Sequence, residues 1–485
     1  MKKIVIVGAG SSGLITATMM KNYWGDQVDI SVYYDKSNKN IAVGESTTPI
    51  IRLLLRHLGM RTGDLLKDLK NSVTVKLGIN FKDWIPGTEY FHGFAEVQHD
   101  IGTNTSAIYS IPEGKFNGGM NYNTPEFKIP DRPFEEYDHA VHIDTQEFSN
   151  LIFKKLKGIV NFVDTRIKSV LSDGKNIISL TTEDDEIVTA DLFVDCSGFG
   201  TLLFKHLNPK WNDISNALPL DRAIPQQIPH KFMKTPAFTV AEATDNGWTW
   251  RIPIGDRYGT GYVYSSRFLS DDEAREKYDA WLFKNLKVHL DTDRIIRYRP
   301  GYYDKYYIGN CLAVGLSSGF VEPLESTGLQ VVIQQVQEFL TINSTLLNLD
   351  YNRKLLNASN TKLYVDIVDF ICLHYNTNRT DSEFWKYMTD NKTEWVKQFD
   401  AKCRAEFLDS RSSFREKTFW GLDSWVQVCD GLKMFNNDSI QNFLESKNDR
   451  NIISLQAKED DRYQKDEKSR IKWISHRKVL DSLTK

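Results

Sequence analysis

A glycine-rich loop near the start of the chain has the residue types and spacing that bind a dinucleotide. Residues 8–13 read GAGSSG and stand between a short apolar run typical of a buried parallel strand and an apolar helical pattern. The first glycine permits a tight turn, the second lets a pyrophosphate approach the backbone, and the third lets helix and strand pack closely, while the helix N-terminus attracts phosphate charge. The predicted phosphate contacts are Gly8, Gly10, Ser11, Ser12 and Gly13.

Further along the chain, other strand ends extend this prediction. Asp35 follows a strand pattern over residues 28–34 and can accept hydrogen bonds from a ribose, as such an acid does about 20 residues after the loop. A second strand-to-glycine unit over 190–198 is typical of FAD-binding chains, although it also fits an ordinary sheet strand. The motif alone does not separate FAD from NAD. The predicted cofactor-binding set is completed by Gly44, Glu45, Asp195 and Gly315.

A proline-containing segment at residues 320–328, FVEPLESTG, precedes an apolar periodic pattern that predicts a helix from 329 to about 347. A carboxylate beside a helix N-terminus is stabilised as an anion, so Glu325 can accept a proton or a hydrogen bond. The amides of Thr327 and Gly328 can bind a small anion. Ser326 or Thr327 can also cap the helix in the ordinary way, which is the alternative without a ligand.

One lysine lies in a strand pattern. Residues 73–82 alternate apolar and polar, with Thr74, Lys76 and Lys82 on the polar face. The alternation by itself predicts a solvent-exposed Lys76, since single lysines are rarely buried. Only a context that buries the polar face would make its amine reactive.

Two tryptophans stand one residue apart in the stretch 247–253, GWTWRIP. Side chains at i and i+2 of a strand point to the same face, so Trp248 and Trp250 are predicted to form one broad aromatic wall. Ile252 and Pro253 continue this strand. What the wall separates does not follow from the pattern.

Composition limits the class of protein. The chain has 485 residues, with 61 basic against 64 acidic, so neither a nucleic-acid nor a membrane-surface partner is indicated. No apolar run approaches the roughly 18 to 20 residues that cross a bilayer. Five scattered cysteines without metal-like spacing predict buried free thiols in a reducing compartment, hence a cytoplasmic protein without a metal site. A monomer, a homodimer and a higher homo-oligomer are all compatible with these properties.

Taken together, these residues resemble the flavin-dependent halogenases of the tryptophan halogenase type. The resemblance rests on GAGSSG at 8–13, Lys76 in its strand, FHGF at 91–94, DCSGF at 195–199, GWTWRIP and FVEPLESTG. It extends to about residue 385. It implies an α/β fold of the aromatic-hydroxylase type, with a Rossmann-like FAD-binding lobe, an inserted β-sheet substrate lobe and a helical C-terminal region.

The resemblance also implies a reaction. Reduced FAD reacts with O2 to give a flavin C4a-hydroperoxide, a halide ion attacks its distal oxygen, and hypohalous acid passes through a tunnel to the substrate pocket. By the same resemblance Lys76 hydrogen-bonds this acid or carries the halogen as a haloamine. Glu325 orients the halogenating species and accepts the proton lost on rearomatisation.

The remaining roles follow from the resemblance as well. The backbone of Thr327 and Gly328 would hold the halide, and Ser326 would line the tunnel. The strand of Trp248, Trp250, Ile252 and Pro253 would separate flavin from substrate. His92 and Phe94 would pack against the substrate ring. A separate flavin reductase would supply FADH2 by diffusion, because no second nucleotide fingerprint for NAD(P)H is evident.

Two alternatives remain open at this point. An aromatic monooxygenase of the same fold is disfavoured because Leu316 stands where those enzymes carry an acid. A non-catalytic flavin-binding protein is the other. The resemblance fades in the last third, where residues 431–456 offer Phe435 and Phe443 among polar residues. An indole, phenol or aniline is therefore as good a candidate substrate as free tryptophan.

The predicted division of the chain has three parts. The FAD-binding lobe comprises residues 1–60, 140–215 and 295–345. The substrate lobe comprises 61–139 and 216–294. The helical region, residues 346–485, would close the substrate pocket.

Overall fold

The structure is a computed structural model. It describes residues 1–37, 45–94, 128–130, 133–134, 137–229, 235–255, 257–345, 350–406, 408, 419–436, 438, 473–476 and 480. Gly44 and Phe443, both named from the sequence, lie outside the described residues.

The chain separates into two compact units. The first comprises Met1–Val73, Ile143–Asp221 and Arg297–Val365. The second comprises Thr74–His142, Arg222–Ile296 and Asp366–Lys485. The region beyond residue 345 is thus divided, since its first part belongs to the first unit and the rest to the second.

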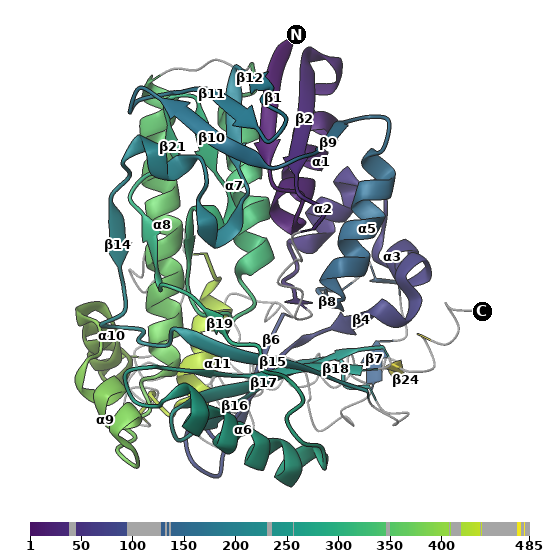
Figure 1. The fold of residues 1–485 in the computed structure, drawn as a ribbon. Coiled ribbons are helices and arrows are strands. Elements are labelled where there is room, and N and C mark those ends of the chain that lie inside the picture. Colours follow the sequence, from purple (N-terminus) through teal and green to yellow (C-terminus); the bar gives the residue numbers. More distant parts are fainter. Residues whose placement is uncertain are drawn as a thin grey trace, which may run out of the picture. The chain divides into compact units, whose positions relative to one another are not determined.

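The first unit contains a sheet in the order β21-β22-β13-β1-β2-β9. β1 lies at its centre and pairs in parallel with both β13 and β2, beside helix α1 (Figure 1). β9 and β22 extend the parallel sheet, and β21 is an antiparallel edge. The strands are β1 (Lys2–Val7), β2 (Val28–Tyr34), β9 (Asn161–Asp164), β13 (Leu192–Asp195), β21 (Tyr307–Ile308) and β22 (Cys311–Ala313). This is the predicted FAD-binding Rossmann-like arrangement, and the predicted fold class is confirmed.

Helices flank this sheet. Helix α1 contacts α2, α5 and α7. α5 begins at an extended Asp144 whose carboxylate accepts the amides of Gln146 and Glu147, which is an effective N-cap. The helices of this unit are α1 (Ser11–Trp24), α2 (Ile51–His57), α3 (Thr62–Leu69), α5 (Thr145–Leu156) and α7 (Gly328–Ile342), and α8 (Asp350–His374) continues from this unit into the second.

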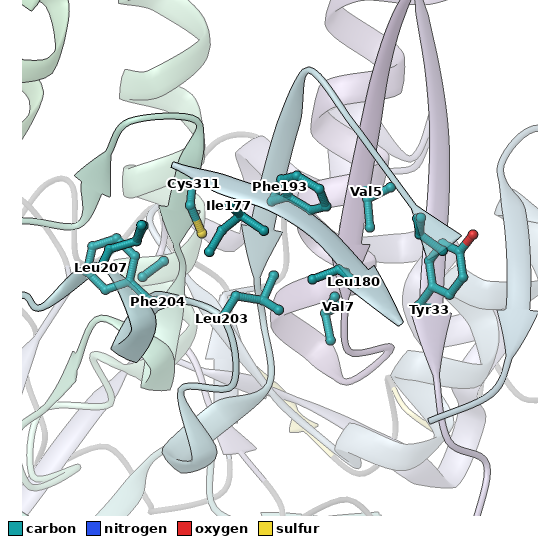
Figure 2. Close-up of a cluster of buried hydrophobic side chains, with 12 residues drawn as sticks. Val5, Val7, Tyr33, Ile177, Leu180, Phe193, Leu203, Phe204, Leu207 and Cys311 are labelled. Carbon is teal, nitrogen blue, oxygen red and sulfur yellow. The ribbon is translucent and has the colours of Figure 1, made fainter. Parts of the chain in front are cut away.

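One hydrophobic cluster covers a face of the parallel sheet (Figure 2). Ile177 and Leu180, from an antiparallel ribbon, meet Phe193 of β13 and Val5 of β1. Cys311 joins the same cluster, and all five cysteines of the chain are buried free thiols, as predicted. The ribbon consists of β10 (Ile167–Ser172), β11 (Ile177–Thr182) and β12 (Ile187–Val188). A second small sheet comprises β14 (Trp211–Asp213), β20 (Gly301–Tyr303) and β23 (Gly319–Phe320).

The second unit is built on a sheet in the order β19-β15-β18-β17-β16-β5-β6. Helix α6 (Asp271–Leu286) packs on it, and Tyr278 and Leu282 are buried against Ile224 and Tyr262. The strands are β5 (Gly78–Lys82), β6 (Glu89–Gly93), β15 (Arg222–Pro229), β16 (Thr239–Thr244), β17 (Gly247–Ile254), β18 (Arg257–Tyr264) and β19 (Ile296–Arg297).

The same unit holds the later helices and four short strands. These are α9 (Glu383–Asp390), α10 (Glu394–Ala405), α11 (Leu422–Gly431), β4 (Val73–Lys76), β7 (Lys128–Pro130), β8 (Ala140–Ile143) and β24 (Trp473–Ser475). β24 pairs with β7, so the far C-terminal strand is held antiparallel against a segment more than 300 residues earlier. Among the described residues, none of the helices is both long and apolar enough to span a bilayer.

Candidate functional site

The glycine loop lies at the carboxyl ends of the central parallel strands, where open α/β sheets bind ligands. Gly8 has φ of 111°, and a Cβ there would stand 2.3 Å from the Cys196 carbonyl oxygen. A Cβ on Gly13 would stand 1.9 Å from the Gly8 carbonyl oxygen. Both positions therefore exclude any side chain. Helix α1 begins after Gly10 without a side-chain cap, which leaves the amides of its first turn for a phosphate.

Gly315, after the third strand, completes this cradle. Its φ is 65°, and a Cβ there would stand 2.5 Å from Ser12 Oγ. Its amide donates to Gln335 Oε1 at 3.0 Å, which ties the loop to helix α7. Because side chains are excluded here, a pyrophosphate can approach the backbone closely, so the cradle fits a dinucleotide.

Asp35 follows β2, as predicted. Its pKa is lowered to about 2 because the Ser37 hydroxyl, the Arg166 guanidinium and the Ser37 amide all bond to the carboxylate. The group is therefore an anion and an acceptor at neutral pH. Glu45 begins the two-residue strand β3 (Glu45–Ser46).

Asp195 is completely buried at the end of β13 and has a structural task. One carboxylate oxygen accepts from the amide and hydroxyl of Ser197 and from Ser317 Oγ, and the other accepts from the amides of Leu203 and Phe204 at 2.7 and 2.9 Å. These bonds fold the chain after β13 into a fixed loop and attach it to the segment that follows β22. Asp195 thus supports the cradle by fixing the loop next to it.

Glu325 also belongs to the first unit, in the turn before α7, and is 2% exposed. Its neighbour Ser326 has φ of 61°, a conformation that non-glycine residues rarely adopt outside functional or tightly constrained turns. The Ser326 amide donates to the Pro323 carbonyl at 3.0 Å and closes the turn.

Thr327, one of the two residues expected to cap α7, is its N-cap, but its side chain makes no capping hydrogen bond. The backbone of Thr327 is helical, with φ of −78° and ψ of −12°, whereas a capping side chain needs an extended residue to reach back to the first-turn amides. A Cβ on Gly328 would meet nothing within 4 Å. The start of α7 therefore offers uncapped amides beside open space, as an anion site requires.

Lys76 lies in the second unit and is the clearest departure from the sequence pattern. The alternation predicted an exposed lysine, yet its side chain is 0% exposed. β4 ends at Lys76, and the chain resumes as β5 only at Gly78, so the ten-residue pattern is two strands and not one. The ammonium lies 4.9 Å from the centre of the Phe94 ring, which provides a cation–π contact.

A hydrogen-bonded chain covers the polar face of β4. Thr74 donates its hydroxyl hydrogen to the Pro253 carbonyl at 2.6 Å, which attaches the lysine strand to the GWTWRIP strand. Since that hydrogen is used, Thr74 must accept from Nδ1–H of His142 at 3.0 Å. His142 Nε2 then accepts from Thr239 at 2.9 Å. Burial, then the positive charge of Lys76, hold the pKa of His142 well below its usual value.

A second imidazole reaches the same strand from the other end of the chain. His476 Nε2 accepts the Val75 amide at 3.1 Å, and its Nδ1–H donates to the Thr235 carbonyl at 3.0 Å. These partners require the neutral ring, because a proton on Nε2 would face another N–H. Neither His142 nor His476 was predicted as a site residue, and no short-range pattern marks them, since His476 and Val75 are 401 residues apart.

The tryptophan wall is present as predicted. Trp248 and Trp250 lie in β17, 2% and 7% exposed, with ring centres 6.2 Å apart. Gly261 faces Trp250 across the sheet, and a Cβ there would stand 2.0 Å from the indole. Ile252 is also buried. A glycine on the neighbouring strand thus makes room for the Trp250 indole.

His92 and Phe94 belong to an aromatic group in the second unit. The His92 ring lies 5.6 Å from Phe370 of α8, and Phe370 stacks on Trp420 with ring centres 4.0 Å apart. Trp420 was not predicted from the sequence. It lies between residue 385, where the resemblance ends, and the aromatic residues of 431–456.

Comparison with known proteins decides the family. A profile of the tryptophan halogenase family matches residues 3–446. The chain belongs to the tryptophan halogenase family. Tryptophan 7-halogenase RebH from Lentzea aerocolonigenes is 31% identical over 89% of each chain. The flavin-dependent halogenase BrvH from Brevundimonas sp. BAL3 is 28% identical, with a TM-score of 0.81 over 100% of this chain and 99% of its own. Tar14, a tryptophan C-6 flavin-dependent halogenase from taromycin biosynthesis, shares the fold at 24% identity, with a TM-score of 0.88 and full coverage of both chains.

The glycine cradle yields a first prediction. Gly13→Ala places a methyl group against the Gly8 carbonyl, so the loop must shift and FAD affinity should fall at least about tenfold. Gly63→Ala is the matched control, because a Cβ there meets nothing within 4 Å. Fluorescence titration of both variants with FAD measures the effect. Equal affinity of Gly13→Ala and the unaltered protein would contradict the assignment of the loop.

The buried His142 predicts a pH dependence of stability. Its pKa is depressed on folding, so the unfolded chain binds the proton more readily below about pH 6.5. Stability from this group is complete above that pH and is lost as pH falls, by up to about 1.4 kcal/mol per pH unit. Thermal unfolding between pH 5 and 8 should show a shallower acid decline for His142→Asn. The exposed His206→Asn serves as the control and should leave the decline unchanged.

Proposed function

We propose that the protein is a two-component halogenase that uses FADH2, O2 and a halide ion to halogenate electron-rich aromatic compounds, such as indoles, phenols and anilines. A separate flavin reductase would supply the reduced cofactor by diffusion. The observation that carries this proposal is Lys76, a fully buried lysine held beside an aromatic ring on a strand tied to GWTWRIP. Membership of the tryptophan halogenase family supports it.

The first unit would bind the cofactor. The amides after Gly10 hold the pyrophosphate, Asp35 accepts from the ribose, and the packing of Ser12 on Gly315 keeps the cradle closed to other side chains. When bound, FADH2 supplies the electrons that reduce O2 and so convert halide to hypohalous acid. Thr327 and Gly328 present their amides to the halide, which is attracted by the positive end of α7.

Lys76 would deliver the halogen. Its amine either donates a hydrogen bond to hypohalous acid or forms a haloamine, with the N–H proton and the hydroxide leaving as water. Transfer of the halogen from nitrogen to an aromatic carbon, with uptake of a proton by the nitrogen, restores the amine. The ring then loses its proton to a base. Burial serves this task because bulk water would otherwise compete for the lysine hydrogen bond.

Glu325 would assist the halogenating species and act as the base of the reaction. As a buried carboxylate beside a helix N-terminus it can orient the halogenating species by hydrogen bonding and accept the proton released on rearomatisation. The left-handed backbone at Ser326 sets the direction of the turn that carries it. The paired tryptophans would keep the aromatic substrate apart from the flavin, so that oxygen is not transferred to the ring.

Replacing Lys76 tests the proposal most directly. Lys76→Met keeps the length of the side chain and removes the amine, so halogenated product should fall by a factor of about 10² or more while flavin oxidation continues. The assay combines FAD, reductase, NADH and O2 with chloride or bromide, with catalase present, and detects products from an aromatic panel by mass spectrometry.

Lys82→Met is the matched control for that experiment, because this lysine is partly exposed and its partner Glu242 keeps a second ion pair with Arg251. Full halogenation by Lys76→Met would overturn the mechanism. Products heavier by one oxygen in the unaltered protein would identify a monooxygenase instead.

Glu325→Gln should also slow halogenation, by about 10² or more, because the amide cannot accept a proton. FAD affinity should stay within twofold of the unaltered protein, since the cofactor contacts are elsewhere. Glu338→Gln on helix α7 is the control and should be active. Product formation at the unaltered rate by Glu325→Gln would exclude this residue as the base.

A further inference from the structure

Helix α11 approaches the open edge of the sheet in the second unit closely. β6 is the last strand of that sheet, and α11 packs against it. The contact is so close at Gly431 that a Cβ there would stand 2.3 Å from the Tyr90 ring. An edge strand has backbone groups without a strand partner on its outer side, and α11 covers them here.

One side chain of α11 makes the connection. Phe94 donates its amide to Leu77 on the inner side, so the preceding amide, that of Gly93, points outward. Gln427 Oε1 accepts this amide at 2.8 Å. Because a backbone N–H bonds only to an acceptor, the oxygen and nitrogen of the Gln427 amide are assigned without ambiguity.

The other half of that amide has no partner within the described part of the chain. Gln427 is 3% exposed, and its Nε2 donates to no acceptor. A buried donor of this kind is unfavourable unless something bonds to it. The bond from Gly93 prevents the amide from rotating to relieve this, so a two-hydrogen donor is held in place.

The position of this donor matters for the reaction. Gly93 is flanked by His92 and Phe94, the residues proposed to contact the substrate ring, and the Phe94 ring lies beside the Lys76 ammonium. The His92 ring in turn lies beside the ring of Phe370. Gln427 is therefore attached to the short segment that would carry the ring, and Phe94 of that segment contacts the lysine that would halogenate it.

We propose that Gln427 is a specificity-determining residue whose Nε2 donates a hydrogen bond to an acceptor oxygen on the aromatic substrate. This inference rests on the proposed function and deepens it. It names the substrate class as electron-rich aromatics that carry a carbonyl or similar oxygen on a side chain. A substrate that presents only an ammonium group to this position would place donor against donor.

Gln427 could instead serve only to cover the edge of β6, and two variants separate these roles. Gln427→Glu, measured at pH 8, keeps an acceptor for the Gly93 amide and removes the donor. Gln427→Met removes both. A purely structural residue would tolerate Gln427→Glu, whereas a substrate donor would be lost in both variants. Thermal unfolding of each variant confirms that it is folded.

The probes are indole-3-acetamide and 3-isobutylindole, which have similar shape and differ in the side-chain carbonyl. Dissociation constants come from calorimetry, and turnover of each probe is measured separately with FAD, reductase, NADH, O2 and bromide. The unaltered protein should bind the acetamide about five to ten times more tightly. Both variants should lose this preference, through weaker binding of the acetamide with binding of 3-isobutylindole within twofold.

Retention of the preference by Gln427→Glu would overturn the inference, and so would its absence in the unaltered protein, including absence of binding of both probes. The proposed function fails separately. A preference in binding without brominated product from either probe would leave the ligand class in place and refute the halogenase reaction.

Discussion

The second unit is organised around one constraint, which is that the amine of Lys76 is buried although it would be more stable in water. A lysine removed from water is unfavourable unless its surroundings offer polarisable or hydrogen-bonding groups. Here Lys76 has the face of Phe94, and neutral imidazoles lie along its strand. Thr74 uses its single hydrogen on Pro253 and so requires a proton on Nδ1 of His142, while burial and the nearby charge of Lys76 disfavour a second cation there.

The first unit meets a different requirement, which is close approach of backbone to a ligand. Gly8, Gly13 and Gly315 each stand where a Cβ would collide with neighbouring atoms, so the loop can form only with glycine. Asp195 then consumes its whole hydrogen-bonding capacity in holding the adjoining loop. Asp195 was predicted to bind the cofactor because it stands at a strand end. In the structure its carboxylate instead fixes the shape of this loop.

Contacts between residues far apart in the sequence hold several elements of the second unit in place. The lysine strand is held from one side by the GWTWRIP strand and from another by His476, near the C-terminus. The edge strand with His92 is held by α11 through Gln427. The motifs within residues 8–328 indicate the family and its reaction. The residues proposed to surround the substrate are held by segments that lie late in the sequence.

The sequence by itself determined the features that are local. GAGSSG with its strand and helix predicted the Rossmann-like unit, and the spacing of Trp248 and Trp250 predicted their shared face. It predicted a solvent-exposed Lys76, and that expectation was wrong. An alternating pattern shows which residues share a face of a strand but not which segments cover that face. β8 and His476, which contact the lysine strand, are too distant in the sequence for the pattern to predict. Only the tertiary structure decides such burial, because water is excluded by whichever segments pack together and not by the residues next in the chain.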